Sequence, residues 1–219
     1  MTVTFASLKT SIAAKLTDGD LSYPTSSQIG DVINSIIFKY ENKRFWWLFN
    51  SATITLNASD PVVPNIPSNF KDEIVPGGLV IVYNNIRYPL IKIKPDVYDM
   101  RNISAVGLPS TYTFVNGQYK LLFYPQLAYT MTLSYRVLVA ALIADGDSNV
   151  FTNNAYRLIE YASLEEIYAT YKKDPEMANY YKNKAKDEFT EIMDESYQRM
   201  ASGALTPEFA TYYTDYNWR

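Results

Sequence analysis

An Asn116-Gly117 dipeptide between two segments of strand-forming residues constrains the fold of this chain more than any other feature. The segments Thr111–Val115 and 118–124 are rich in Tyr, Phe, Val and Leu. Asn and Gly tolerate the positive φ angles that a two-residue type I′ turn needs, so this pattern predicts a tight β-hairpin. We expect the middle of the chain, and the stretch 107–135 above all, to be a β-domain built around this hairpin.

Further strand patterns surround the hairpin. Pro109 and Pro125 flank it, and we expect them to end its two strands. The other predicted strands are 52–56, 75–82, 87–92 and 130–139. A second turn is predicted at 83–86, and we expect 87–92 to pair back across it. Within 130–139 apolar and polar residues alternate, which predicts one buried face.

Helical patterns lie on both sides of the predicted strands. Apolar residues recur at spacings of three and four in 4–16, in the segment after Thr25, in 152–172 and in 175–200. We expect Thr25 to lie in the N-cap region of the second helix, and Pro175 to lie in the first turn of the last one. The predicted apolar stripe of the last helix consists of Met177, Tyr181, Ala185, Phe189, Ile192 and Met193.

The order of these elements predicts an α+β fold. We expect a four-helix bundle, made from the N- and C-terminal helices, joined to a central antiparallel β-domain that is a sandwich or a barrel. The expected parts are N-terminal bundle helices at 1–44, the β-domain at 45–141, a C-terminal helix pair at 150–200 and an extended arm at 201–219.

The aromatic block at 44–49 contains the adjacent residues Trp46 and Trp47. Neighbouring residues on a strand face opposite sides, so we expect one Trp in the β-core and the other over the junction with the helices. The functional alternative is an aromatic platform for a ligand.

The composition excludes several kinds of catalytic site. The chain has no Cys and no His, which rules out thiolate nucleophiles, Ser-His-Asp triads and zinc sites built from Cys or His. The segment from Asp145 begins like a calcium loop, but Val150 occupies the position of the required Gly, and Tyr156 that of the required Glu. We therefore expect no enzyme, no cofactor and no metal.

Charge and hydropathy limit the partners. The net charge of −3 argues against a protein that grips the phosphate backbone of nucleic acid. Neither a signal peptide nor an apolar run of about 20 residues is visible, so we expect a soluble protein made in the cytoplasm. The twenty Tyr residues suit both strands and protein interfaces, and both interpretations stay open.

The C-terminal segment changes character after Met200. It carries five aromatic residues in a setting where a solvated tail is normally polar: Phe209, Tyr212, Tyr213, Tyr216 and Trp218. We expect an arm that docks on a partner through these residues; the alternative is that it folds back over its own domain.

The order of the motifs resembles that of the head-to-tail adaptor proteins of tailed bacteriophages, including tail tubular protein A of short-tailed phages. The motifs that carry the resemblance are Tyr23-Pro24-Thr25, Ile33-Asn34-Ser35-Ile36, the block 44–49, 66–70, 107–112 with its hairpin, Tyr124-Pro125, 133–136 and 158–162. Only their order and spacing are specific, and they cover the chain except for its final residues.

The resemblance implies a structural virion protein at the head-to-tail interface. Such adaptors form a ring, usually of twelve copies, under the portal protein, where the ring continues the DNA channel and supports the tail or nozzle proteins. In several of them a C-terminal segment inserts into the portal, which matches the arm. DNA passes through the lumen without specific binding, and no membrane is involved.

Three other functions compete with this interpretation. A carbohydrate-binding tail component would use Trp46, Trp47 and a Tyr-rich β-surface to stack on sugars. A capsid decoration or scaffolding protein would share the oligomeric, non-catalytic character. A hydrolase would need a carboxylate pair in a cleft, but the acidic residues gather mainly on the last helix, as a solvated face.

Overall fold

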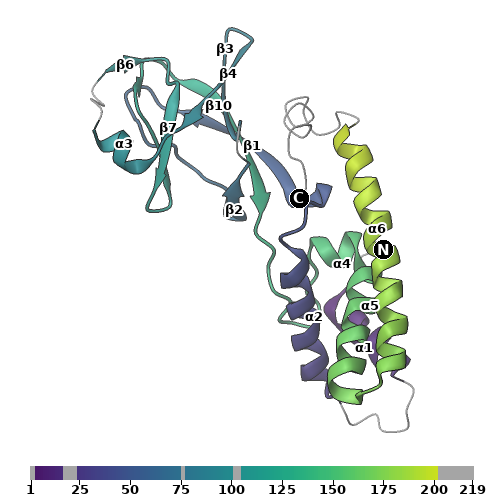
Figure 1. The fold of residues 1–219 in the computed structure, drawn as a ribbon. Helices are drawn as coiled ribbons and strands as arrows, with labels where there is room; N and C mark the ends of the chain where they lie inside the picture. The colour runs from purple at the N-terminus through teal and green to yellow at the C-terminus, as the bar shows by residue number, and fades with distance from the viewer. Residues whose placement is uncertain (1–2, 17–23, 75–76, 101–104, 202–219) are drawn as a thin grey trace. The chain divides into compact units, whose positions relative to one another are not determined.

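A computed structural model of the chain describes residues 3–16, 24–74, 77–100 and 105–201. These residues divide into two compact units (Figure 1). The helical unit contains the described residues up to Leu48 and from Val139 onward, and the β unit runs from Phe49 to Leu138. Each unit has its own hydrophobic core.

The two N-terminal helices begin where the sequence predicts. In α1 (Phe5–Lys15) the hydroxyl of Thr4 accepts a hydrogen bond from the Ser7 backbone, and the Ser7 hydroxyl accepts one from Thr4 in return. In α2 (Ser26–Tyr40) Thr25 and Gln28 form the same reciprocal capping box. Each box satisfies two backbone N–H groups that have no partner within the helix.

The C-terminal helices are α4 (Val150–Asn154), α5 (Tyr156–Ile167), a π-helical turn η2 (Tyr168–Lys172) and α6 (Pro175–Ala201). Ala155 interrupts the helix that the sequence predicts from 152, because its backbone is not helical, with φ of −142° and ψ of 30°. Lys173 ends the π-helical turn in the left-handed conformation, and the Asp174 carboxylate then caps α6 by accepting from the N–H groups of Glu176 and Met177.

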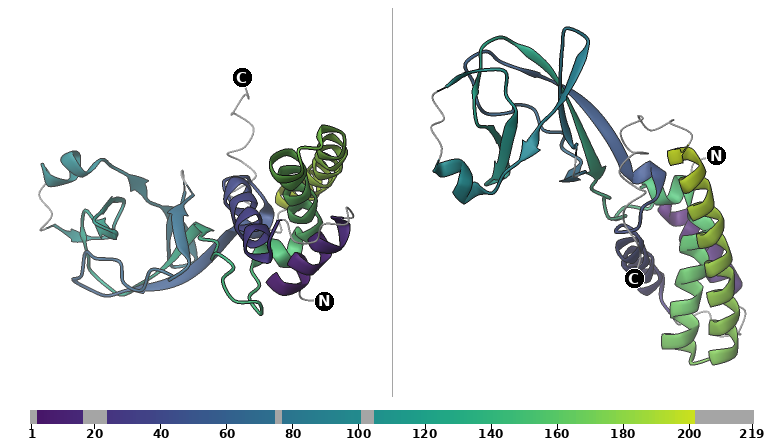
Figure 2. Two further views of the ribbon diagram at one scale, coloured as in Figure 1. Left: turned by 90° about the horizontal axis from the view of Figure 1, so that it is seen from below. Right: turned by 45° about the horizontal axis from the view of Figure 1, so that its top comes forward.

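α5 lies at the centre of the helical unit. It contacts α1, α2, α4 and α6, and it runs alongside α6 in every view (Figures 1 and 2). All five apolar positions predicted for 152–172 are buried: Ala155, Leu158, Ile159, Ala162 and Tyr168. Side chains from α1, α2, α5 and α6 share a single hydrophobic core.

The expectation for the two Trp residues was wrong. They lie on a short 3₁₀ helix, η1 (Trp46–Leu48), and not on a strand. Trp47 is buried in the core of the helical unit, stacked on Phe45 at 4.8 Å between ring centroids, and Trp46 packs against the same core. The 3₁₀ turn and the contacts with Phe151 and Phe189 override the strand propensity of the block.

The β unit is built around its last strand. β10 (Tyr129–Val137) pairs with β1 (Phe49–Leu56) along one side, and with β2 (Phe70–Glu73) and β3 (Leu79–Tyr83) along the other. Met131, Leu133 and Tyr135 are buried, as the alternation predicts. The five-stranded sheet ends at β4 (Ile86–Pro89), which pairs with β3 across a turn where Asn84 and Asn85 both have positive φ.

The Asn116-Gly117 hairpin is confirmed, but it is not the centre of the unit. β7 (Thr111–Val115) and β8 (Gln118–Leu121) pair across the dipeptide, with φ of 52° at Asn116 and 76° at Gly117. They form a separate three-stranded sheet with β5 (Ile91–Lys92). The centre is β10, because it alone contacts three other strands of the described β unit.

Two details of the predicted strand pairing were wrong. Ile91 and Lys92 do not pair back onto β3; they leave the hairpin and pair in parallel with β7. Pro125 does not end a hairpin strand, because β8 stops at Leu121 and Pro125 lies in β9 (Tyr124–Pro125), parallel to β6 (Val106–Gly107). The short helix α3 (Pro95–Asp99) packs on β7.

A buried carboxylate links the two larger sheets. Glu73 on β2 forms an ion pair with Lys92 on β5 and accepts a hydrogen bond from the Tyr112 hydroxyl on β7 at 3.0 Å. The side chain of Glu73 is only 6% exposed, so its charge needs these partners. The cluster therefore fastens the hairpin sheet to the five-stranded sheet.

Candidate functional site

The predicted docking residues Phe209, Tyr212, Tyr213, Tyr216 and Trp218 lie outside the described residues. The structure describes the helix that carries them, α6, as far as Ala201. The described part of the candidate site consists of the base of the arm, which is the last turn of α6, and of the surfaces of the helical unit.

The last turns of α6 are held against η1. The backbone N–H of Trp46 donates to the Ser196 hydroxyl at 3.3 Å, and that hydroxyl donates to the Ile192 carbonyl at 2.8 Å. The Arg199 guanidinium lies over the Trp46 ring, 4.1 Å from its centroid, which is a favourable cation–π geometry. The base of the arm is thus fixed beside Trp46. Sequence reasoning missed this contact, because the partners are 150 residues apart.

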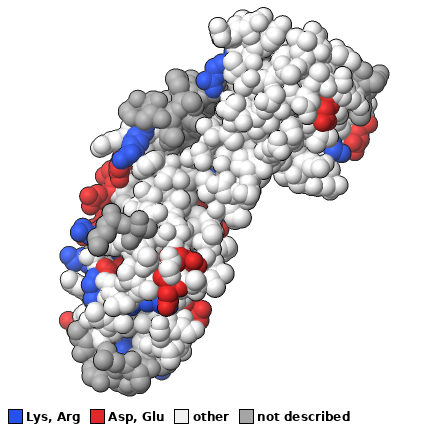
Figure 3. Space-filling view, turned by 180° about the vertical axis from the view of Figure 1, so that it is seen from behind, with Lys and Arg blue, Asp and Glu red and all other residues white. Residues whose placement is uncertain are grey.

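The outer face of α6 is strongly acidic in its second half. A shallow cavity of about 540 Å³ is lined by Asp187, Thr190, Glu191, Asp194, Glu195 and Gln198. Charged side chains of both signs gather over the helical unit, whereas few are seen on the face of the β unit shown in Figure 3. These carboxylates form a solvated face of the helix, as the sequence predicts.

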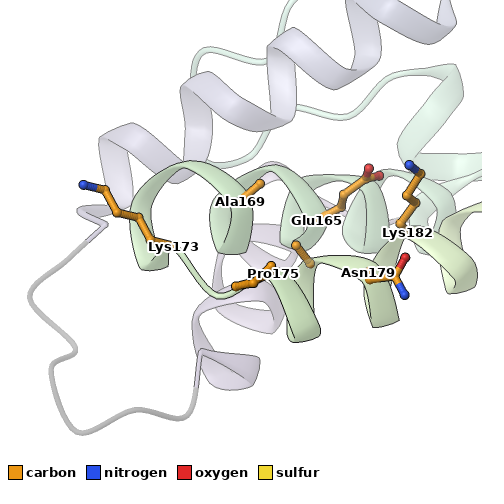
Figure 4. Close-up of a pocket in the computed structure, with 7 residues that line it drawn as sticks. Glu165, Ala169, Lys173, Pro175, Asn179 and Lys182 are labelled. Carbon is orange, nitrogen blue, oxygen red and sulfur yellow. The ribbon is translucent and has the colours of Figure 1, made fainter.

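A second cavity, also about 540 Å³, lies where α5 and η2 turn into α6, lined by Glu165, Ala169, Lys173, Pro175, Ala178, Asn179 and Lys182. Glu165 and Lys182 point the same way, and Lys173 points away from them (Figure 4). The cavity is an open surface groove, and it holds neither an acid pair nor a buried nucleophile among its described lining residues.

The loop at 145–149 is a turn that leads into a helix cap, as the sequence predicts. The Asp147 carboxylate accepts hydrogen bonds from the backbone N–H groups of Ile143 and Ala144, which hold its pKa below the usual value. Asn149 caps α4 by accepting from Phe151 and Thr152. Asp147 Oδ2 and Asn149 Oδ1 thus accept hydrogen bonds from the chain's own backbone.

The buried Tyr hydroxyls of the β unit have a structural role. Burial raises the pKa of Tyr112 and of Tyr119 far above the usual value, and the negative charge of Glu73 raises both further. Both hydroxyls therefore stay protonated at neutral pH and act as hydrogen-bond donors. Among the described residues no three His, Cys, Asp or Glu side chains gather as a metal-binding group.

The structure does not support the Trp-based sugar platform on the β unit. Trp47 is only 8% exposed, and Arg199 lies over the half-buried ring of Trp46. Both rings belong to the helical unit, so neither contributes to a Tyr-rich surface of the β unit.

These observations define a class of protein. The described residues give an α+β chain with helices at both ends and an antiparallel sheet, whose ionisable groups are paired within the fold or solvated. No described helix has the length and apolar character needed to span a bilayer. The class that these elements define is a mixed α+β protein.

The chain belongs to the SU10 adaptor protein family, whose family model matches residues 3–208. This is a family of bacteriophage head-to-tail adaptors, so the resemblance seen in the sequence is confirmed. Membership makes the chain a structural virion protein with a non-enzymatic role. No curated protein matches it.

Proposed function

We propose that the chain forms a ring, of twelve copies, below the portal protein at the capsid vertex. The ring continues the DNA channel and provides the platform on which the tail or nozzle proteins assemble. The observation that carries this proposal is the match to the adaptor family over residues 3–208, which spans both units. In the ring each helical unit acts as a four-helix bundle that packs beside its neighbours.

Exposed apolar side chains on the helical unit support contacts between copies. Phe38 is 68% exposed and Ile143 is 86% exposed. Phe38 lies one turn after Asn34 on α2, and Asn34 binds both backbone groups of Leu142, the neighbour of Ile143. Large apolar side chains exposed together on a soluble protein mark an interaction surface.

The charge of the chain suits a conduit for DNA. A net charge of −3 gives no overall attraction for phosphate groups, and the acidic half of α6 would repel them. DNA can then slide through the lumen without being held by Lys or Arg. The same surface charge keeps the free protein soluble before assembly.

The arm is proposed to bind the portal. Its five aromatic residues, Phe209, Tyr212, Tyr213, Tyr216 and Trp218, supply anchors of the kind that dominate binding energy at interfaces. One arm contributes modest affinity, but a ring of arms binds with high avidity because the later contacts form within one assembly.

The test is the mass of the purified protein by light scattering, alone and mixed with its portal. A ring alone, or a monomer that becomes a portal-bound ring, supports the proposal. A monomer that ignores the portal overturns it and favours a capsid decoration role.

Two variants test the arm. Removal of residues 205–219 should abolish portal attachment. A full-length variant with Ser in place of the five aromatic residues should fail in the same way, because it keeps the length but loses the anchors. Normal attachment by both variants would contradict the portal-binding role.

A further inference from the structure

Most free strand edges of the described β unit are protected against pairing with another strand. β4 ends at Pro89, and its only outward N–H group is that of Arg87, because Ile86 and Tyr88 pair with β3. Three of the four residues of β2 are charged. The edge of β8 is covered by the segment 61–63, since Val63 donates to Tyr119 and Leu121 donates to Pro61.

β1 is the exception. It pairs with β10 over eight consecutive residues without a bulge, and its sequence, FNSATITL, contains no charged residue and no Pro. Its other edge has no partner strand within the described residues. Long, regular, uncharged edges are the ones that accept a further strand, and folded proteins normally block them with charges, Pro or bulges.

The outward-facing groups of β1 can be assigned. Ser134 of β10 donates its N–H to Gly78 and accepts from Ile74, so its backbone faces away from β1. Groups alternate along an antiparallel pair, so the partner of Ser134, Ser51, also faces away from β10. The Ser51 N–H accordingly donates to the Asn50 side chain, at 2.8 Å.

The same alternation exposes the backbone groups of Thr53 and Thr55. Both side chains are exposed, and neither backbone has a hydrogen-bond partner on that edge among the described residues. On the opposite face Ile54 and Leu56 are buried in the core. An added strand would therefore gain backbone hydrogen bonds at Thr53 and Thr55 and extend the core beside Ile54.

The C-terminal segment follows a helix end that contacts Trp46, and Trp46 precedes β1 by three residues. Arg199 lies over Trp46, and Ala201 ends α6 two residues later. Phe49, the first residue of β1, follows Trp46 by three residues, so it lies within about 11 Å of Trp46 however the two units are arranged. The spacer 202–208 can bridge up to about 25 Å, which is enough to reach this edge.

The composition of the segment suits the edge. Residues 211–218 read TYYTDYNW, in which Thr, Tyr and Trp favour strands and only Asp215 is charged. A chain that leaves the neighbourhood of Trp46 and follows β1 runs in the same direction as β1. The pairing would therefore be parallel, with the helices as the crossover connection that parallel strands need.

We propose that residues 209–218 add to the free edge of β1 in their own molecule as a parallel outer strand. In the free protein this pairing keeps the arm bound to β1, and binding of the portal displaces the arm from β1. The second step rests on the proposed function; the pairing itself does not. β1 is thus a docking surface for a segment of the same chain.

Amide hydrogen exchange of the purified chain tests the pairing. Thr53 and Thr55 should exchange at least about tenfold more slowly in the full chain than in a chain that ends at residue 204. The Ile54 amide, which faces β10, serves as the control and should be the same in both. Equal exchange at Thr53 and Thr55 would overturn the proposal.

An edge variant separates pairing from general stability. Thr53→Pro removes an N–H that β10 does not use, so it should raise exchange at Thr55 to the level of the truncated chain. Thr53→Ala keeps the N–H and should retain the protection. If Thr53→Pro left Thr55 protected while Ile54 was unchanged, the segment would not lie on this edge.

Cysteine cross-linking identifies the source of the strand, because the chain contains no Cys of its own. Thr53→Cys is combined with Cys at 211, 212, 213 or 214, either in one molecule or in two molecules that are mixed. A cross-link within one molecule is expected. Cross-links only between molecules would assign the strand to a neighbouring copy and overturn the proposal, as would their complete absence.

The portal distinguishes this proposal from the proposed function. Portal addition should raise exchange at Thr53 and Thr55 in the full chain. Protected amides in a chain that ignores the portal would keep the pairing and reject the portal-binding role. If Thr53 and Thr55 were unprotected in a chain that forms a portal-bound ring, the pairing with β1 would be rejected and the portal-binding role would stand.

Discussion

Lys15 at the end of α1 and Glu160 in the middle of α5 form an ion pair with 2.6 Å between Nζ and Oε2. The Glu160 side chain is 5% exposed, and it also accepts a hydrogen bond from the Ser11 hydroxyl. The pair joins residues 145 positions apart, and it fastens the first helix of the chain to the central helix of the helical unit.

Lys15→Met should destabilise the helical unit by about 1–3 kcal/mol, because it leaves a buried carboxylate with one partner fewer. Lys15→Arg keeps the charge and should cost less. Urea unfolding followed by Trp fluorescence measures both values. An unchanged midpoint in Lys15→Met would show that water replaces the ammonium group at no cost.

Asn34→Ala should destabilise the helical unit by about 1–3 kcal/mol, because it removes two hydrogen bonds. The Asn34 side chain donates to the Leu142 carbonyl and accepts from the Leu142 N–H, both at 2.9 Å. Asn34→Asp keeps the acceptor and loses the donor, so its thermal midpoint should lie between those of the parent and Asn34→Ala. Equal midpoints for the parent and Asn34→Ala would contradict the role of this contact.

The β unit should lose stability at alkaline pH. In the unfolded chain Tyr112 ionises near its ordinary pKa of 10.0, whereas in the folded chain burial and Glu73 raise its pKa. Its contribution is therefore fully present below pH 10 and is lost as the pH rises above that value. The loss should reach about 1 kcal/mol at pH 11 for this one group.

Tyr112→Phe should make the alkaline decrease in the free energy of unfolding shallower, and adding Tyr119→Phe should reduce it further, because Tyr119 is raised for the same reasons. Tyr197→Phe, at an exposed position on α6, is the control. Denaturant unfolding at pH 8, 10 and 11 gives the free energy of unfolding as a function of pH. An equal decrease in the parent and in all variants would refute the assignment of this decrease to Tyr112 and Tyr119.

Gly117→Ala should destabilise the hairpin of β7 and β8 by about 1–2 kcal/mol, because φ at this position is 76° and a Cβ is strained there. Gly107→Ala is the matched control: a Cβ there meets nothing within 4 Å, and the change should stay within about 0.5 kcal/mol. The two thermal midpoints should therefore separate, and coinciding midpoints would count against the strained turn.

Phe38→Ser and Ile143→Ser should weaken ring formation on the portal without unfolding the free protein. Both side chains are largely exposed, so their loss should change the free energy of unfolding by no more than about 0.5 kcal/mol. Light scattering of the portal mixture gives the ring mass. If the variants formed rings of full mass at the same protein concentration as the parent, this surface would be excluded as a contact between copies.

Local signals in the sequence predicted the elements well. Thr25 caps α2 as predicted, Asn116 and Gly117 form the predicted turn, and the stripe of α6 faces the core. In each case the information lies within a few residues of chain, where backbone geometry and periodicity decide the outcome.

Long-range partners could not be predicted. The aromatic block at 44–49 suited a strand locally, yet packing against Phe151 and Phe189 placed Phe45 and Trp47 in the helical core. The central role of β10 depends on which strands pair, and alternation alone does not reveal the partner. The base of the arm joins Trp46 to Ser196 and Arg199, a contact for which the sequence contained no local signal.

The placement of the Trp residues makes the chain its own spectroscopic probe. Of the three Trp residues, Trp46 and Trp47 lie in the helical unit, Trp218 lies in the arm, and the β unit has none. In Trp218→Phe, Trp emission reports the helical unit alone. The difference between that variant and the parent isolates the arm, so that capture by a portal can be followed in real time without an attached dye.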